Sequence, residues 1–385
     1  MIEIQTKYKQ AIASFLGVDS TSIFLYWKGR IALYAALKAL GVGKKDEVII
    51  PAFTCVVVPN AIIYLGAKPI YTDVDLSSMC ATRESIEAKI TDRTKVIIIQ
   101  NMLGLSNEVE EIIEMAKAKG IHCVEDCTHG FGGSYNEKPN GTLSDMSFYS
   151  TQWNKPFSTG VGGILSVNNP DLLEKIQNIN NELITPSFKT RFSLATLIKI
   201  KKYILNDSTY WFLIRLYRKL SKMGLVIGSS NKDEITGINQ PENYFMASGN
   251  IQAETGISEL KKLKEKIEER IHNGLIYNDY FIKNKFFHFK DDLIKNHSFL
   301  KFPILVKDRK KFMENAEKAK IRLGDWFISP IHPVEQGFEN WQLQIEEFPN
   351  AHFLTKHIVN LPTDEIDITK VMSFLELNKD QLLEL

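Results

Sequence analysis

Lys155 stands between a segment rich in hydroxyl side chains and a glycine-rich turn, a pattern suited to amine chemistry. Ser150 and Thr151 precede the lysine, and Thr159 opens the run Thr-Gly-Val-Gly-Gly after it. Partial removal of a lysine from water lowers its pKa and frees the neutral amine to form an imine. A solvated loop lysine is the alternative reading. The turn is not a dinucleotide-binding fingerprint, because no Gly-x-Gly-x-x-Gly opens a helix directly after a strand.

Two other places in the sequence have the charge or backbone pattern of a ligand site. Asp126 ends the apolar run Ile-His-Cys-Val-Glu-Asp, so a strand there would bring its carboxylate to the edge at which open α/β sheets bind ligands. A buried carboxylate needs a cationic or hydrogen-bonding partner, and a cofactor cation, a loop backbone or a metal would each serve. Gly29 and Arg30 precede a helical pattern, whose first N–H groups suit an anion such as a phosphate.

The elements that must position these residues belong to a wound α/β region between about residues 27 and 168. Short β-branched runs alternate there with helical patterns that end in glycine, which predicts a mostly parallel sheet. The expected buried strands are residues 47–53, 69–75, 95–100 and 121–126, and the expected helices are residues 31–41 and 108–120.

Residues 186–230 interrupt this alternation with apolar, aromatic and basic side chains and no strand signal. We expect one or two amphipathic helices inserted into the larger domain. Their apolar faces either pack on the rest of the protein or a second subunit, or make a peripheral membrane contact through residues 190–228. The second alternative arises because aromatic and aliphatic positions alternate with lysine and arginine.

The chain after Gly237 is predicted to form a smaller α+β domain. It holds one long charged helix, two strands on either side of another helix, and a final helix after Asp367. We therefore expect a large domain over residues 1–240 and a small domain over residues 241–385. The elements expected in the small domain are the long helix 251–271, the strands 299–306 and 326–332, and the helix 308–322.

The composition excludes several classes of protein. With 385 residues, 44% of them hydrophobic, the chain can bury a large core, and its formal charge of +1 offers no field that would attract nucleic acid. The cysteines form neither paired zinc knuckles nor a disulfide framework, so we expect reduced thiols, no metal and a cytoplasmic protein. The N-terminus lacks the pattern of a signal peptide, and no segment is apolar enough to span a membrane. The cysteines are Cys55, Cys80, Cys123 and Cys127.

An ordered set of motifs resembles the DegT/StrS family of sugar aminotransferases, which have the aspartate aminotransferase-like fold called fold type I. The motifs occur in the family's order and extend over about two-thirds of the chain. The resemblance implies a fold type I pyridoxal-phosphate (PLP) transferase, with a mostly parallel central sheet and a smaller C-terminal α+β domain. The motifs are GRIALYAALKALGVGKKDEVIIPAFT, NAIIYLGAKPIYTDVD, TKVIIIQ, VEDCTHGFGGSY, SDMSFYSTQWNKPFSTGVGG and the C-terminal EEFPNAHFLTKHIVNLPT.

The resemblance assigns the cofactor and its contacts. It implies that pyridoxal 5'-phosphate is held as a Schiff base by Lys155, and that Asp126 pairs with the pyridine nitrogen and keeps the ring an electron sink. Without the resemblance, His129 would be read as a satisfied core histidine. The other implied contacts are His129 beside the ring, Ser150, Gly29 and Arg30 at the phosphate, and Thr54 and Cys55 in the adjoining segment.

The sequence departs from the family pattern at several positions. Arg30 replaces the usual hydroxyl residue, and its guanidinium either adds charge to the phosphate site or turns to solvent. Cys55 stands where the family often has a ring-stacking aromatic residue, so the stacking partner stays open. Val161 replaces a frequent glutamate. Residues 242–254 match only loosely, and the contacts that this segment makes to a neighbouring subunit in the family are not carried over.

The implied activity moves an amino group from an amino acid donor, which the family suggests is glutamate, to a keto-sugar linked to a nucleotide. Fold type I sites form at dimer interfaces, so the resemblance also implies a homodimer. A sugar dehydratase of the same fold is an alternative, against which Lys155 argues because some such relatives have histidine there. A non-catalytic PLP-binding or membrane-associated module is another. His332 and Trp153 are candidate substrate contacts, whereas Trp27 and Trp326 stay open between core packing and stacking.

Overall fold

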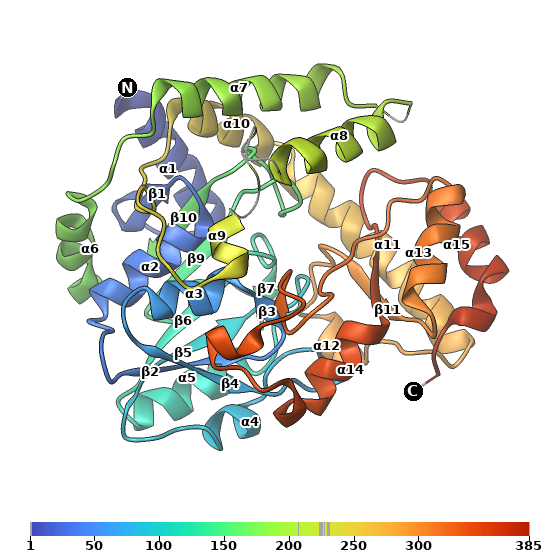
Figure 1. The fold of residues 1–385 in the computed structure, drawn as a ribbon, viewed down its shortest axis with the longest axis horizontal. Coiled ribbons are helices and arrows are strands. Elements are labelled where there is room, and N and C mark those ends of the chain that lie inside the picture. Colours follow the sequence, from blue (N-terminus) through green and yellow to red (C-terminus); the bar gives the residue numbers. More distant parts are fainter. Residues whose placement is uncertain (1, 207, 223–225, 227, 229–231, 385) are drawn as a thin grey trace.

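A seven-stranded sheet forms the centre of the larger part of the molecule (Figure 1). The computed structural model describes residues 2–206, 208–222, 226, 228 and 232–384. The strand order is β1-β10-β9-β6-β5-β2-β4; neighbours from β4 to β9 run parallel, and β10 runs antiparallel to β9 and β1. The strands are β1 (Ile23–Tyr26), β2 (Glu47–Pro51), β4 (Lys68–Thr72), β5 (Thr94–Gln100), β6 (His122–Asp126), β9 (Met146–Ser150) and β10 (Gly163–Val167).

The predicted wound α/β region is confirmed. The four expected strands are β2, β4, β5 and β6, whose continuous apolar runs are buried because helices cover both faces of the parallel sheet. The two expected helices are α2 and α5. The helices of this region are α1 (Ile2–Leu16), α2 (Gly29–Ala39), α3 (Val57–Ile63), α4 (Arg83–Glu87), α5 (Val109–Ala118) and α6 (Leu173–Asn180), and a small hairpin joins β7 (Ser134–Tyr135) to β8 (Lys138–Pro139).

The long helix predicted over residues 251–271 is wrong in one respect, because the structure has two helices there. α10 (Asn250–Leu260) ends before a turn at residues 261–262, and α11 (Leu263–Lys283) follows it. Leu260 and Leu263 are both buried on either side of the turn. The turn lets α10 pack along α1 while α11 continues into the C-terminal part, so tertiary packing overrides a helical pattern that runs through it.

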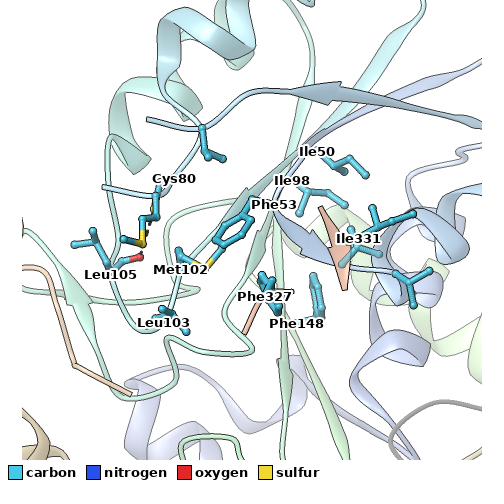
Figure 2. Close-up of a cluster of buried hydrophobic side chains, with 14 of the residues drawn as sticks. Ile50, Phe53, Cys80, Ile98, Met102, Leu103, Leu105, Phe148, Phe327 and Ile331 are labelled. Carbon is cyan, nitrogen blue, oxygen red and sulfur yellow. Dashed lines mark hydrogen bonds between the residues drawn. The ribbon is translucent and has the colours of Figure 1, made fainter. Parts of the chain in front are cut away.

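The strand predicted over residues 326–332 is wrong in extent. Only β12 (Ile331–His332) is a strand, and it pairs in parallel with β3 (Thr54–Cys55) of the larger part. Figure 2 shows Phe327 and Ile331 packed near Phe53, whose ring centroid lies 5.3 Å from that of Phe327. The other expected strand is β11 (Phe302–Leu305), which pairs with β13 (Ile358–Leu361).

The remaining helices confirm the other expectations for the C-terminal part. They are α12 (Asp291–Ile294), α13 (Arg309–Lys318), α14 (Pro349–His357) and α15 (Ile368–Leu377). Asp367 begins α15 by accepting a hydrogen bond from the backbone N–H of Lys370 at 3.2 Å. The division into domains at residue 240 stays a prediction.

The expected insertion of amphipathic helices is present as α7 (Phe188–Tyr203) and α8 (Tyr210–Lys222), followed by the short α9 (Lys232–Thr236). Part of the predicted 186–230 segment lies outside the described residues. All four cysteines are free of disulfide bonds. Within the described ranges, no helix has both the length and the apolar character needed to cross a membrane.

Candidate active site

The loop that carries Lys155 connects the antiparallel strands β9 and β10 and is closed by its own backbone. The N–H of Thr159 donates to the carbonyl of Thr151 at 2.8 Å, and the N–H of Lys155 donates to that of Gln152 at 3.0 Å. The threonine hydroxyls lie 2.6 Å apart and are buried. The hydroxyl-rich segment seen in the sequence therefore builds the closure of the loop.

Two side chains from the C-terminal half donate hydrogen bonds to the backbone of the same loop. Gln252 of α10 donates from Nε2 to the carbonyl of Val161 at 2.6 Å. Arg270 of α11 donates to the carbonyl of Pro156 at 3.0 Å while it pairs with Asp364 at 2.6 Å, and the arginine is buried. Sequence reasoning missed both hydrogen bonds, because a polar residue in a helical pattern does not reveal which distant loop it contacts.

The environment of the Lys155 amine favours its neutral form. Burial lowers the pKa of Lys155 to about 8; the charges of Asp126 and Cys55 act in the opposite direction, and that of Arg30 adds to the fall. Desolvation has the largest effect on this pKa, because it destabilises the charged ammonium form and not the neutral amine. The side chain of Lys155 is half-buried, so it is not the fully solvated loop lysine of the alternative.

Asp126 ends β6 at the edge of the sheet that faces the lysine loop. Its side chain is buried and accepts a hydrogen bond from the N–H of Thr128 at 3.1 Å. Burial raises the pKa of Asp126, while the Thr128 hydrogen bonds and the Lys155 charge lower it. Since each charge acts on the other group's pKa, the amine and the carboxylate lie within electrostatic range of one another.

The neighbouring carboxylate, Glu125, points the other way, as alternation along a strand requires. It accepts hydrogen bonds from the N–H groups of Gly141 at 2.9 Å, Leu143 at 3.3 Å and Ser144 at 3.1 Å, and from the Ser144 hydroxyl. Backbone donors thus satisfy Glu125, and only Asp126 is available to the site.

His129 and Trp326 form a stack beside Lys155. Their ring centroids are 4.8 Å apart with an interplanar angle of 11°, and Lys155 Nζ lies 4.8 Å from the centroid of the Trp326 ring. His129 accepts a hydrogen bond at Nδ1 from the N–H of Leu103 at 3.2 Å, and burial holds its pKa well below the usual value. His129 is therefore neutral, and Trp326 belongs to the site, not to the core alone.

The start of α2 lies directly against β9. A Cβ on Gly29 would lie 3.0 Å from the Cβ of Ser150, so a larger residue would require the neighbouring strand to shift. The side chain of Lys28, the residue before the helix, is half-buried, and burial lowers its pKa to about 8. The N–H groups of the first turn, Ser150 and Lys28 therefore make an electropositive corner beside the lysine loop.

Arg30 is buried, so the expectation that it might turn to solvent is wrong. It forms an ion pair with Glu234 of α9, and both side chains are almost fully covered. The hydroxyl of Tyr244 donates to the Arg30 carbonyl at 3.1 Å. A charge contribution to a phosphate site stays a prediction, and Glu234 is a partner that sequence reasoning missed.

The pairing of β3 with β12 brings Thr54, Cys55 and His332 to the same site. The buried Thr54 hydroxyl donates to Gln100 Oε1 at 2.5 Å, and His332 is the register partner of Cys55. Burial lowers the pKa of His332 to about 4, and the charge of Lys155 adds to the fall. Burial raises the pKa of Cys55, which keeps the thiol protonated.

Gln100 ends β5, so the position at a strand end that indicated Asp126 in the sequence would have indicated Gln100 as well.

The two remaining tryptophans of interest lie apart from the stack. Trp153 packs beneath the insertion, with its ring 6.5 Å from that of Tyr217 and 5.5 Å from Lys201 Nζ. A substrate contact through Trp153 stays a prediction. Trp27 is fully buried, and its carbonyl accepts a hydrogen bond from Gln252 at 3.2 Å, so it packs in the core.

The amino-acid sequence was compared with protein families and with known proteins. The pattern of the DegT/DnrJ/EryC1/StrS aminotransferase family matches residues 4–197 and 205–372. GDP-perosamine synthase from Escherichia coli O157:H7 is 40% identical over 147 residues, 38% of this chain and 40% of that protein. UDP-N-acetyl-3-dehydro-alpha-D-glucosamine 3-aminotransferase from Acidithiobacillus ferrooxidans is 35% identical over 154 residues, 40% of this chain and 42% of that protein. Each match thus spans about two-fifths of the relative.

A solved structure supports the fold over the whole chain. The aminotransferase from Psychrobacter cryohalolentis superposes with a TM-score of 0.74 at 19% identity, covering 97% of this chain and 90% of that one. The predicted fold class, an α/β fold type I transferase with a mostly parallel sheet, is confirmed.

Proposed function

The chain belongs to the DegT/DnrJ/EryC1/StrS aminotransferase family, and from this premise we propose that it is a PLP-dependent aminotransferase. It takes the amino group from an amino acid, which we propose is glutamate, and gives it to the ketone of a nucleotide-linked sugar. The observation that supports the proposal is that the amine of the half-buried Lys155 and the buried Asp126 carboxylate lie within electrostatic range, so that each charge acts on the other's pKa.

The residues of the site fit PLP, which has an aldehyde, a ring nitrogen and a phosphate. Lys155 offers an amine with a lowered pKa to the aldehyde, and Asp126 offers a buried carboxylate to the ring nitrogen. The start of α2 beside Ser150 offers N–H donors to the phosphate, and Gly29 leaves the backbone there open to close approach. We propose the implied roles for His129, Arg30, Thr54 and Cys55 as well, and substrate contacts for His332 and Trp153.

When bound, PLP supplies an electron sink for the negative charge that develops at the substrate carbon. Asp126 would hold the positive charge at the ring nitrogen of PLP, because it offers a buried carboxylate at the end of β6. Lys155 Nζ would move the proton at the reacting carbon. His129 accepts the Leu103 N–H at Nδ1 and burial lowers its pKa, so it would be a neutral neighbour of the cofactor.

The attachment of PLP should depend on pH with a midpoint of about 8. The neutral amine is the nucleophile, and burial lowers the pKa of Lys155 to about 8, so attachment is slow below this pH and levels off above it. Measuring the rate of the absorbance change on mixing apo-protein with PLP from pH 6 to pH 10 checks this. A midpoint near the ordinary lysine value of about 10.4 would show that the amine is solvated.

Trp326 should supply the aromatic face that Cys55 does not. We expect Trp326→Ala to weaken PLP binding about tenfold, since a stacked aromatic contact contributes about 0.5–1.5 kcal/mol beyond its burial, whereas Trp326→Phe should stay close to the unaltered protein. Titration followed by cofactor absorbance measures the dissociation constant, with Trp211→Phe on α8 as the control. Tighter binding in Trp326→Ala would mean that the indole competes with the ring for His129.

The substrate class is supported by the names of the relatives, which act on nucleotide-linked sugars. The test is transfer of label from [15N]glutamate to a panel of nucleotide-linked keto-sugars, read by mass. A labelled amino-sugar supports the proposal. Release of water with formation of a deoxy-sugar would assign the dehydratase alternative, and no turnover of any sugar together with no bound cofactor would leave only the fold.

We propose that the protein works as a homodimer in the cytoplasm. The fold type I resemblance supports the first statement, and the four free cysteines support the second. We also propose a peripheral membrane contact through residues 190–228, since exposed aromatic and basic side chains gather there. Sedimentation velocity of the purified protein measures the oligomeric state.

A further inference from the structure

Helices α7 and α8 lie at the upper edge of the molecule in the view of Figure 1 and are attached to it by their inner sides. Leu194 of α7 is buried, and Tyr217 of α8 packs on Trp153. Arg215 of α8 pairs with Glu317 of α13. The two helices are therefore packed on the folded protein, and α7 has a defined outer side.

The outer side of α7 carries large apolar side chains that nothing in the described chain covers. Phe188, Phe192 and Tyr203 are 75%, 64% and 72% exposed. At about 100° per residue these three positions fall within about 60° of one another and lie roughly opposite Leu194. A helix with apolar residues on both sides packs one face on the core of the protein and leaves the second face available to a binding partner.

The segment that carries this outer side is strongly basic. From Leu183 to Lys222 the sequence holds nine lysines and arginines and one aspartate, a formal charge of +8 in a chain whose total is +1. Lys189, Lys199 and Lys202 are exposed on α7 among the aromatic residues. Exposed aromatic residues interleaved with lysines suit the boundary between anionic headgroups and acyl chains.

We propose that the outer face of α7, continued by Phe212 and Leu216 of α8, docks on an anionic phospholipid membrane. Phe212 and Leu216 are 68% and 39% exposed. A second copy of this chain is the less favourable occupant, because a two-fold interface would set this basic face against itself. An anionic surface neutralises the charge while its acyl region takes up the aromatic rings. The inference does not depend on amino transfer.

Co-sedimentation of the PLP-loaded protein with vesicles tests the proposal. We expect binding to vesicles that contain phosphatidylglycerol, little binding to phosphatidylcholine alone, and release at 1 M salt, where the Debye length is about 3 Å. Each lysine near an anionic surface is worth about fivefold in affinity, so the triple variant Lys189→Glu/Lys199→Glu/Lys202→Glu should bind at least about 100-fold more weakly.

Matched variants separate this face from net charge and general hydrophobicity. Lys310→Glu/Lys311→Glu/Lys318→Glu on α13 changes the charge equally at exposed positions and should retain most of the binding. Phe188→Ser/Phe192→Ser should lose binding, whereas Ile282→Ser/Leu377→Ser, at residues 44% and 84% exposed, should retain it.

Three results would overturn the proposal. The first is no co-sedimentation with anionic vesicles at low salt. The second is equal loss of binding in both lysine triples, which would reduce the effect to net charge. The third is dissociation of an oligomer by Phe188→Ser/Phe192→Ser in sedimentation velocity, which would make a second copy the occupant. Amino transfer measured on the same variants should be unchanged, so failure here is distinct from failure of the proposed function.

Discussion

Replacing Lys155 by alanine is expected to lower the turnover number for amino transfer by about 10⁴-fold, the upper end for loss of a general acid–base group. In the proposed mechanism Lys155 would both hold the cofactor and move the proton, and its charge lowers the pKa of Asp126. The measurement is label transfer from [15N]glutamate, together with peptide mass mapping after borohydride reduction. The cofactor mass should lie on Lys155 in the unaltered protein and be absent from the variant.

Two further variants control this result. Lys155→Arg keeps a positive charge but has no neutral amine at accessible pH, so it should be as inactive as the alanine variant. Lys301→Met removes another half-buried lysine whose pKa burial lowers and on which the charge of Asp364 acts, and should retain turnover per folded molecule. A cofactor mass on some other lysine in the unaltered protein would contradict the assignment.

Asp126→Asn should lower the turnover number by about 10²–10³-fold, the range found when one charge-stabilising group is removed from a site. Asparagine has the same shape and still accepts the Thr128 N–H, so the loss reports the charge. Because the Asp126 charge raises the pKa of Lys155 against the effect of burial, the variant should also shift the pH midpoint of PLP attachment downward. Steady-state kinetics and the absorbance titration measure the two effects.

The matched control is the adjacent carboxylate. The two carboxylate oxygens of Glu125 accept from three backbone N–H groups, and Glu125→Gln replaces one oxygen by an NH2 donor, so it should lower the free energy of unfolding by about 1–3 kcal/mol and leave turnover per folded molecule unchanged. An unchanged pH midpoint in Asp126→Asn would contradict the placement of the two groups in one site.

The sequence predicted the large α/β region well because each of its elements is specified locally. The runs that became β2, β4, β5 and β6 are short, β-branched and bounded by turns, and parallel burial on both faces produces that pattern wherever it occurs. Prediction from local patterns failed where packing between distant segments determines where a helix ends. Residues 251–271 have one helical period, yet the chain turns at residues 261–262 because α10 and α11 pack against different parts of the core.

The site divides in the same way. Asp126 and Gly29 were predicted from a strand end and a helix start, Lys155 from its hydroxyl-rich and glycine-rich flanks, and Ser150 from the resemblance to the family. Trp326 was left open, and Gln252, Arg270 and Glu234 were missed. Each of these four residues lies 91 or more positions along the chain from the residue that it contacts, and no local pattern encodes such a contact.

By itself, the sequence predicted the wound α/β architecture and the amphipathic character of the insertion, since composition and period are local properties. Its ordered motifs, through the resemblance to the family, predicted the fold type and proposed the amine and carboxylate of the site. Only the tertiary structure decided that Trp326 stacks on His129 over the Lys155 amine, that Arg30 is buried against Glu234, and which side of α7 faces outward. The physical reason is that burial, and with it every pKa shift in the site, depends on which remote side chains exclude water.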